Sequence, residues 1–216
     1  MRRRLWLAGA VAWPAAVRAD GAALVAAAEA GDLVSLQRLL DSGTPVDARD
    51  ARRRTALLAA THANRVDVAR LLIERGADVN AKDELQDSPF LYAGAHGRLA
   101  IMRLTLAAGA DLKSTNRYGG TALIPAAHYG HVETVRELLK TRIDVDHVNR
   151  LGWTALLEAI ILGDGGADHT EIVRLLVAHG ARVQLADAQD VTPLAHAETR
   201  GQKAIVEILR RAGAKA

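Results

Sequence analysis

Cysteine is absent from the 216 residues, and aromatic residues make up only 3% of the chain. Without cysteine the protein has no disulfide bonds and no thiol nucleophile, although it stays compatible with an oxidising compartment. The sequence also contains no phosphate-binding Gly-Lys-Ser/Thr loop, no His-Glu-x-x-His motif and no Gly-x-Ser-x-Gly motif. Because these common signatures of enzymes are missing, we expect a protein that is not an enzyme and carries no cofactor.

The first 19 residues have the pattern of a cleavable secretory signal. Three arginines, Arg2 to Arg4, precede an apolar run from Leu5 to Ala16, and Val17-Arg18-Ala19 places small residues before a cleavage point at Asp20. The apolar run is shorter than the ~20 residues that a membrane span needs. We expect an exported, periplasmic protein with no membrane span after cleavage; a retained N-terminal anchor or helix is the alternative.

Removal of this segment changes the charge balance. The whole chain has 28 basic and 25 acidic residues, but four of the arginines and none of the acids lie in residues 1–19. The remaining chain has 24 basic and 25 acidic residues, a net charge of −1. A nucleic-acid partner is therefore not expected, since such a partner usually needs a strongly basic surface.

Most of the chain repeats with a period of 33 residues. Equivalent hydroxyl residues lie at Thr55, Ser88, Thr121 and Thr154, and a fifth, Thr192, follows after a step of 38 residues. Each opens a similar phrase, such as TALLAATHAN or TALIPAAHYG, and a second phrase such as LLIERGADVNA follows at a fixed offset. A fixed period of this size predicts stacked helical units rather than one closed core, and binding rather than catalysis.

Within each unit the sequence predicts a polar turn, a short helix and an amphipathic helix. The hydroxyl residue is placed to cap the short helix, and Pro89 and Pro193 fit its first position. The turns open with residues that hydrogen-bond nearby backbone, namely Asp50, Asp83, Asn116, Asn149 and Asp187. The short helices end at residues that tolerate a left-handed conformation, namely Asn64, Gly97, Gly130, Gly163 and Gly201.

These phrases, together with Gly-Ala-Asp-Val-Asn at residues 76–80, resemble the ankyrin repeat family. The resemblance covers about residues 21–216 and implies an all-α ankyrin-repeat solenoid with short β-like turns. It divides the chain into a signal peptide at 1–19 and a repeat domain at 20–216, with degenerate caps at both ends. The six units are approximately residues 21–49, 50–82, 83–115, 116–148, 149–186 and 187–216.

Two departures from the family pattern carry predictions. The histidine that the family places three residues after the hydroxyl residue is replaced by Leu58, Leu91, Ile124, Leu157 and Ala195. The hydrogen-bond network that this histidine forms between repeats should therefore be missing. Arg142 stands where a helix-ending glycine is expected, and a left-handed conformation there would cost roughly 1–2 kcal/mol.

The longer step in the fifth unit comes from an insertion, Asp164 to Asp168, between its two helices. The simplest interpretation is a surface loop in which Asp168 caps the next helix and Glu171 completes a capping box. An alternative is a cation site built from Asp164, Asp168, His169 and Glu171, although the spacing is not that of a calcium loop. We therefore predict no metal ligand here.

The resemblance implies that a partner protein binds the concave surface, which is formed by turn tips and first helices. The central units concentrate apolar and aromatic residues at positions expected to face water, and arginines are placed to surround them. The candidate partner-binding residues are Arg52, Arg54, Leu85, Arg117, Tyr118, His128, Tyr129, Arg150, Leu151, Trp153, Ile161 and Leu162. The alternative for Tyr118 and Trp153 is packing between adjacent turns.

We expect a monomeric protein-interaction scaffold whose partner is another protein of unknown identity. One alternative is an accessory or protective factor for a periplasmic enzyme, for example in oxidative-stress defence, and it rests only on resemblance to secreted bacterial ankyrin proteins. Another is a haem or metal carrier that uses His62, His96 and His128, which share one predicted face. These histidines would be about 10 Å apart, too far to share one metal ion.

Overall fold

The structure, a computed structural model, describes residues 15–215, with side chains described from Asp20 onward. The predicted signal at residues 1–19 therefore lies largely outside the described residues. The all-α solenoid prediction is confirmed, since the described residues form twelve helices and the one strand-like pairing among them joins Arg49 and Thr55. Within this part of the chain no helix is both long and apolar enough to cross a membrane.

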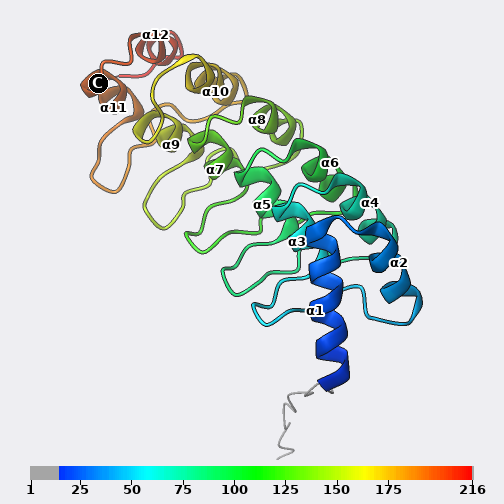
Figure 1. Ribbon diagram of the computed structural model, residues 1–216. Helices are drawn as coiled ribbons and strands as arrows, with labels where there is room; N and C mark the ends of the chain where they lie inside the picture. Colours follow the sequence, from blue (N-terminus) through cyan, green and yellow to red (C-terminus); the bar gives the residue numbers. More distant parts are fainter. Residues whose placement is uncertain (1–14, 216) are drawn as a thin grey trace, which may run out of the picture.

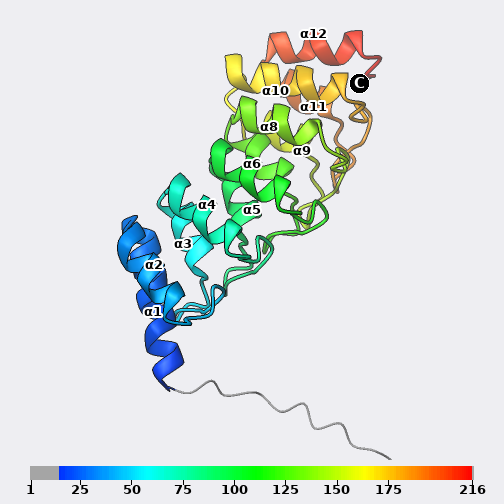
Figure 2. The ribbon, with the colours of Figure 1, turned by 90° about the vertical axis from the view of Figure 1, so that its right-hand side faces the viewer.

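Each unit contributes two antiparallel helices, and the units stack into a curved array (Figures 1 and 2). The first helices are α1 (Ala15–Ala30), α3 (Ala56–His62), α5 (Pro89–Ala95), α7 (Leu123–His128), α9 (Ala155–Ile161) and α11 (Pro193–Thr199). The second helices are α2 (Leu33–Asp41), α4 (Val66–Glu74), α6 (Leu99–Ala107), α8 (Val132–Leu139), α10 (Ala167–Ala178) and α12 (Lys203–Arg211).

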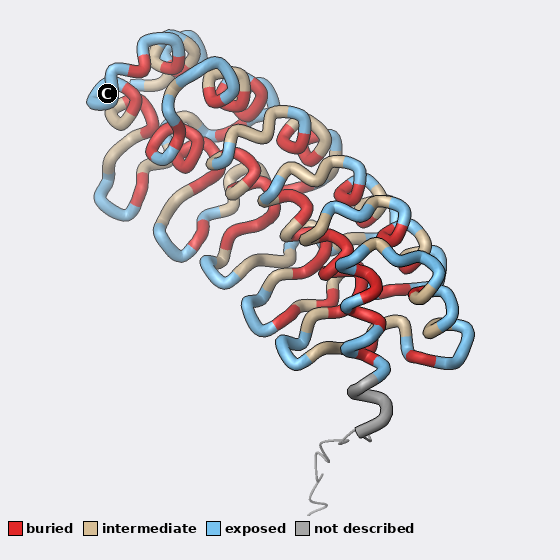
Figure 3. The backbone as a smooth tube through the Cα atoms, viewed as in Figure 1, coloured by how far each residue is buried: buried red, intermediate tan, exposed pale blue. Residues whose placement is uncertain are grey.

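The core is a continuous strip along the stack rather than a single centre (Figure 3). The first helices of units two to five are mostly buried, as in α3, where Ala59 and Ala60 let neighbouring units approach closely. Second helices bury one face, for example Val135 and Leu138 in α8. One unit cannot cover its own apolar face, so the burial depends on the adjacent units.

The turns close as the sequence predicted. In each turn the side-chain oxygen of the opening residue accepts from the backbone N–H groups two and four residues later. Asp50 accepts from Arg52 and Arg54, each at 2.9 Å. The same pair of bonds recurs at Asp83, Asn116, Asn149 and Asp187.

Four of the five predicted hydroxyl caps are present, at Thr55, Ser88, Thr154 and Thr192. The prediction is wrong at Thr121, whose buried hydroxyl has no hydrogen-bond partner. The cause is Pro125. It lacks the N–H that reaches the Thr or Ser carbonyl in the other units, so the Ile124 N–H bonds the Thr121 carbonyl at 3.3 Å and leaves the hydroxyl without a donor.

Two predicted left-handed positions are wrong. Gly163 does not have a positive φ; Gly165, inside the insertion, adopts φ 70° instead. Arg142 is not left-handed either, because the Thr141 hydroxyl ends α8 by donating to the Leu138 carbonyl at 2.6 Å and accepting from the Ile143 N–H at 3.2 Å. In the described residues, the non-glycine positions with a left-handed backbone are Arg53, Asn64, Gln86 and Asp190, of which the sequence predicted Asn64.

The insertion lengthens a helix, which corrects the predicted cap. α10 begins at Ala167 and has 12 residues, so Asp168 lies inside its first turn and no side chain caps it. Asp164 accepts instead from the Gly166 N–H and lies 2.8 Å from His169 Nδ1. Because the left-handed Gly165 turns the chain early, the extra residues add a turn to α10 as well as a short loop.

The histidines of the family's hydrogen-bond network are replaced in this chain, and other side-chain hydrogen bonds join its units. Residues that open a second helix reach a carbonyl in the last turn of an earlier first helix. His169 Nε2 lies 2.8 Å from the His128 carbonyl, and Gln202 donates to the Ile160 carbonyl at 3.1 Å. His169 faces an acceptor at each ring nitrogen, so both of its bonds form together only when both nitrogens carry a proton.

A second series of links joins the loops that follow the second helices. A side-chain oxygen of one unit accepts from a backbone N–H of the next at Asp47–Asp78, Asn80–Asp111, Asp146–Arg182 and Gln184–Lys215. The corresponding side chain at the junction of units three and four is Lys113, which has no acceptor atom. This junction therefore cannot form the link.

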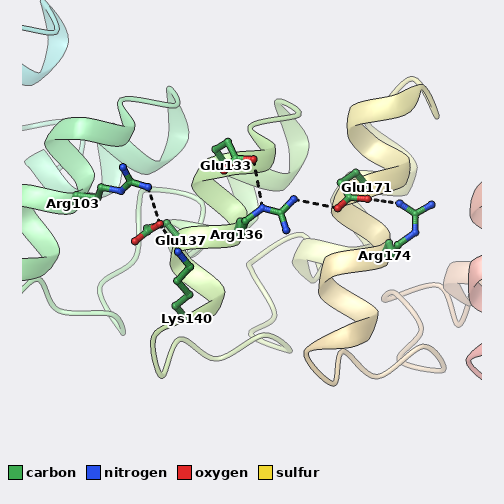
Figure 4. A network of polar contacts seen from close by, with 7 residues as sticks. All are labelled: Arg103, Glu133, Arg136, Glu137, Lys140, Glu171 and Arg174. Carbon is green, nitrogen blue, oxygen red and sulfur yellow. Dashed lines mark hydrogen bonds and ion pairs between the residues drawn. The ribbon is translucent and has the colours of Figure 1, made fainter.

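The outer row of second helices carries ion pairs on its exposed surface (Figure 4). Glu137 on α8 pairs with Arg103 on α6 at 3.1 Å and with Lys140 at 3.0 Å. Arg136 joins α8 to Glu171 on α10 at 3.2 Å. Exposed pairs contribute little stability, about 0–1 kcal/mol each, so this surface is best described as a solvated face whose charges are satisfied by one another.

Candidate partner-binding groove

A hollow of about 300 Å³ opens between the turns and the first helices of units three to five. Its lining combines exposed rings, apolar side chains and several ionisable groups. The lining residues are Asp87, Ala95, His96, Asn116, Arg117, Tyr118, Gly120, Ile124, Pro125, His128, Tyr129, Asn149, Leu151, Glu158 and Leu162. We call this hollow the groove cavity.

Six of the predicted partner-binding residues line the groove cavity: Arg117, Tyr118, His128, Tyr129, Leu151 and Leu162. Tyr118, Tyr129, Leu151 and Leu162 are exposed, between 43% and 58% of their surface. Large apolar side chains that remain this exposed at the edge of a cavity are typical of a surface that a partner covers. Tyr118 is held in place by Arg117, whose guanidinium carbon lies 4.9 Å from the ring centre.

The predicted histidine face exists, but tyrosines separate its members. Tyr92 lies between His62, whose ring is tilted with its centre 3.9 Å away, and His96, which stacks on it at 3.8 Å. Tyr129 stacks on His128 at 4.2 Å. Sequence reasoning missed Tyr92. In the described part of the chain no three His, Asp or Glu residues are grouped closely enough to hold a metal ion.

Glu158 on α9 is the most unusual side chain of the groove cavity. Only 8% of the side chain is exposed, and burial raises its pKa to about 7. Asn149 donates to Oε1 at 2.8 Å, which partly offsets the effect of burial on the pKa. His128 Nδ1 lies 3.8 Å from Oε2, beyond hydrogen-bond distance, so Oε2 has no donor among the residues that the structure describes.

Other ionisable groups of the cavity are also perturbed. Burial and the nearby Asp83 carboxylate raise the pKa of Asp87. Burial lowers the pKa of His128, and the neighbouring His169 adds to this effect. The imidazole of His128 is therefore neutral near pH 7, and Arg117 is the one residue with a permanent positive charge in the lining.

The other six predicted residues lie outside the groove cavity. Arg52 and Arg54 line a separate hollow at units one and two, where Arg54 pairs with Asp50 at 2.8 Å and Glu29 at 3.4 Å. Leu85 is exposed on its own turn. Arg150 bridges two turns by donating to the Arg117 carbonyl at 2.9 Å.

Trp153 and Ile161 differ from the expected exposure. Trp153 is half-buried, with its indole N–H enclosed and without a partner, so the alternative of packing near the turn applies to Trp153 and not to Tyr118. Ile161 is buried, which corrects its placement on the exposed face. The equivalent positions in units two to four, His62, Ala95 and His128, are half-buried, so none of these positions is fully exposed.

Sequence reasoning did not consider Glu158, which also lines the cavity. A signal for Glu158 was present in the chain. It is an acid in the middle of a first helix whose other residues are Ala, Leu and Ile, and the equivalent positions in units two to four hold Ala59, Tyr92 and Pro125.

Comparison with known proteins gives the same architecture. A family model described as "Ankyrin repeats (3 copies)" matches residues 12–83 and 90–165, and one described as "Ankyrin repeat" matches residues 151–188. The chain belongs to the ankyrin repeat family. YahD of Escherichia coli (strain K12), which is named as an ankyrin repeat protein, is 47% identical over 57 residues, 26% of this chain and 28% of YahD.

Three solved ankyrin structures resemble most of this chain. An ankyrin repeat domain from Acinetobacter baumannii AYE is 58% identical with a TM-score of 0.87, covering 89% of this chain and 98% of that one. The ankyrin repeat protein EF0377 is 40% identical with a TM-score of 0.85, covering 88% and 98%. The ankyrin repeat domain of Bcl-3, a member of the IkappaB family, is 30% identical with a TM-score of 0.80, covering 89% and 86%.

Proposed function

We propose that this ankyrin repeat protein is an exported interaction scaffold that binds a partner protein in the groove cavity. The observation that carries the proposal is the exposure of Tyr118, Tyr129, Leu151 and Leu162 around one hollow, in a chain with so few aromatic residues. Tyrosine with neighbouring arginine is a frequent anchor of protein interfaces. The ion-paired outer faces of α6, α8 and α10 offer no comparable apolar surface.

Affinity capture with matched variants tests this proposal. The chain, a Tyr118→Ala/Tyr129→Ala variant and a Leu33→Ala/Val34→Ala control are immobilised in parallel and exposed to an extract of the producing cell. Leu33 and Val34 are exposed apolar residues on α2, outside the groove cavity, so the control removes similar side chains elsewhere. Unfolding curves of all three proteins establish that each is folded.

The expected result is a protein retained by the chain and by the control, and lost from the tyrosine variant. Interface anchors of this type cost about 2 kcal/mol or more when truncated, which is at least a thirtyfold loss of affinity. Equal retention by all three proteins would place the binding surface outside the groove cavity. Retention by the tyrosine variant but not by the control would move it to the first unit.

Export is the second part of the proposal, and it rests on the sequence pattern of residues 1–19. A fusion of these residues to a reporter enzyme that is active only outside the cytoplasm should be active. The exported chain should begin at Asp20, which is read by N-terminal sequencing. Cleavage there would shorten α1, which begins at Ala15. An inactive reporter, or an intact N-terminus on the cellular protein, would contradict this part.

A further inference from the structure

The groove cavity holds a carboxylate with one oxygen that no group in the described part of the chain satisfies. Asn149 donates to Oε1 of Glu158, whereas Oε2 has only the ring of His128, at 3.8 Å. The side chain is more than nine-tenths buried, yet it lines the cavity. Burying a carboxylate is costly unless it is paired, and a glutamine would accept the Asn149 bond without this cost.

We propose that the groove cavity receives the side chain of a lysine carried by the partner protein, with its ammonium group placed against the Oε2 atom of Glu158. This inference rests on the proposed function, because it names the chemical group that a partner segment would insert. It commits to a lysine within a protein segment, since the apolar rim around the cavity is a surface for a chain and not for a small free amine.

Charge complementarity supports a cationic group. With both acids ionised, the cavity has two carboxylates, Asp87 and Glu158, against one permanent positive charge, that of Arg117. Arg117 is already stacked over the Tyr118 ring. The lining therefore has one negative charge in excess, which a single cation would neutralise.

The shape of the site favours lysine over arginine. A guanidinium fork is best matched by both oxygens of a carboxylate, and Asn149 occupies one oxygen of Glu158. A lysine ammonium is a compact charge on an apolar stem. The exposed surfaces of Tyr129, Leu151 and Leu162 line the same cavity and are suited to contact the methylene groups of such a stem.

Binding of the cation should depend on pH through Glu158. Two residues face Glu158 from the neighbouring elements: His128 from α7, neutral near pH 7, and Asn149 from the turn. His196, at the equivalent place on α11, is held by Asp187 at 2.7 Å, and His169 on α10 bonds the His128 carbonyl. With a pKa of about 7, the ionised fraction of Glu158 rises about tenfold between pH 6 and pH 8.

A peptide-library experiment tests the inference. The immobilised chain is exposed to three degenerate libraries of short peptides with blocked ends, whose central residue is lysine, arginine or norleucine. Norleucine keeps the apolar stem of lysine and removes the charge. The same libraries are applied to Glu158→Gln, which can keep the Asn149 bond, and to the control Glu133→Gln, which removes an exposed acid on α8. Circular dichroism confirms that each variant is folded.

The expected result at pH 8 is about tenfold greater retention of the lysine library than of the norleucine library. A tenfold difference in affinity corresponds to about 1.4 kcal/mol of binding free energy. This preference should shrink at pH 6, disappear in Glu158→Gln and persist in Glu133→Gln. Equal retention of the lysine and norleucine libraries, a stronger retention of the arginine library, or an unchanged lysine preference in Glu158→Gln would each overturn the inference.

The experiment also separates this inference from the proposed function. If Tyr118→Ala/Tyr129→Ala loses peptides that the chain retains, but no library is preferred, a partner segment binds the groove and the lysine assignment is wrong. If the chain retains no peptide from any library, both the inference and a groove that takes protein segments are contradicted.

Discussion

Unit two and the central units four and five share the same repeat phrase. They differ in the hydrogen bonds that hold each unit and join it to its neighbours. Unit two has its Thr55 cap, its left-handed Asn64 and its Asp47–Asp78 link to the preceding unit. In units four and five, Thr121 caps nothing and Glu158 is buried without full pairing. Unit four also lacks a link to the preceding unit, because Lys113 of unit three has no acceptor atom for the Asp144 N–H.

This difference shows how a repeat array keeps one fold while its units diverge. The residues that set the helices and turns are present in both regions, so the architecture is the same. A few substitutions remove local hydrogen bonds from the central units, and the groove cavity lies in those units. Four predictions, each a substitution with a matched control, can sharpen or break this comparison.

The largest expected effect comes from Glu158→Gln. The folded-state pKa of about 7 lies above the ordinary value of 4.5, so the stability associated with protonated Glu158 is complete below pH 4.5 and is lost as the pH rises through 7. At pH 8 the variant should be more stable by about 1–3 kcal/mol, and at pH 4.5 the difference should vanish. Urea unfolding at both pH values measures this.

Glu137→Gln on the outer face is the control for that result. It should change the free energy of unfolding in the opposite direction. Its ion pairs with Lys140 and Arg103 lower the pKa of Glu137, so the ionised form stabilises the fold at neutral pH and the contribution disappears as the pH falls. A Glu158→Gln variant that is no more stable at pH 8 than at pH 4.5, relative to the unaltered chain, would show that this carboxylate is not strained.

The next effect compares two caps. Thr55→Val removes a hydroxyl that accepts from the Leu58 N–H at 3.2 Å, and it should lower the free energy of unfolding by about 1 kcal/mol. Thr121→Val removes a buried hydroxyl without a partner, so it should cost nothing or slightly stabilise. Equal losses in thermal unfolding would refute the role assigned to Pro125.

A smaller gain is expected from Lys113→Asn. Asparagine supplies the oxygen that the junction of units three and four lacks, as Asn80 does for Asp111 at 2.8 Å. One such bond contributes about 0.5–1.5 kcal/mol. Amide exchange of residues 116–148 should slow in the variant. The reverse change, Asn80→Lys, should destabilise by a similar amount, and no effect from either change would mean that these links are energetically neutral.

The smallest expected effect concerns the turn tips. Gln86 adopts φ 64°, where units four and five have Gly119 and Gly152. Gln86→Gly should stabilise by about 0.5–1 kcal/mol, because the relief of left-handed strain exceeds the added flexibility of glycine. Arg142→Gly should give no gain, since Arg142 is not left-handed. A gain from Arg142→Gly in thermal unfolding would contradict that backbone conformation.

The sequence predicted what the period repeats and missed what occurs once. Residues equivalent to Thr55 and Asp50 recur in units two to six, so their roles follow from the repeat pattern alone. The failure at Thr121 depends on Pro125 four residues later, and the start of α10 depends on the conformation of Gly165. No sequence motif predicts either effect, because each arises from competition between alternative local hydrogen bonds.

The groove was predicted in part for the same reason. Phase along the repeat placed Tyr118 and Tyr129 on the binding face, and they line the cavity. Position within the repeat could not predict how far Ile161 and Trp153 are buried, because burial depends on the neighbouring helices. It also could not show that Glu158 and Asn149, nine residues apart, meet inside the cavity.

Site-specific photo-crosslinking in the producing cell tests the central claim most directly. A benzophenone amino acid is placed at Tyr129 in the groove and, in a separate variant, at Arg103 on the outer face, where more than half of the side chain is exposed. The account predicts a covalent adduct with one partner protein from position 129 and none from position 103. An adduct from position 103 alone, or none from position 129, would contradict it.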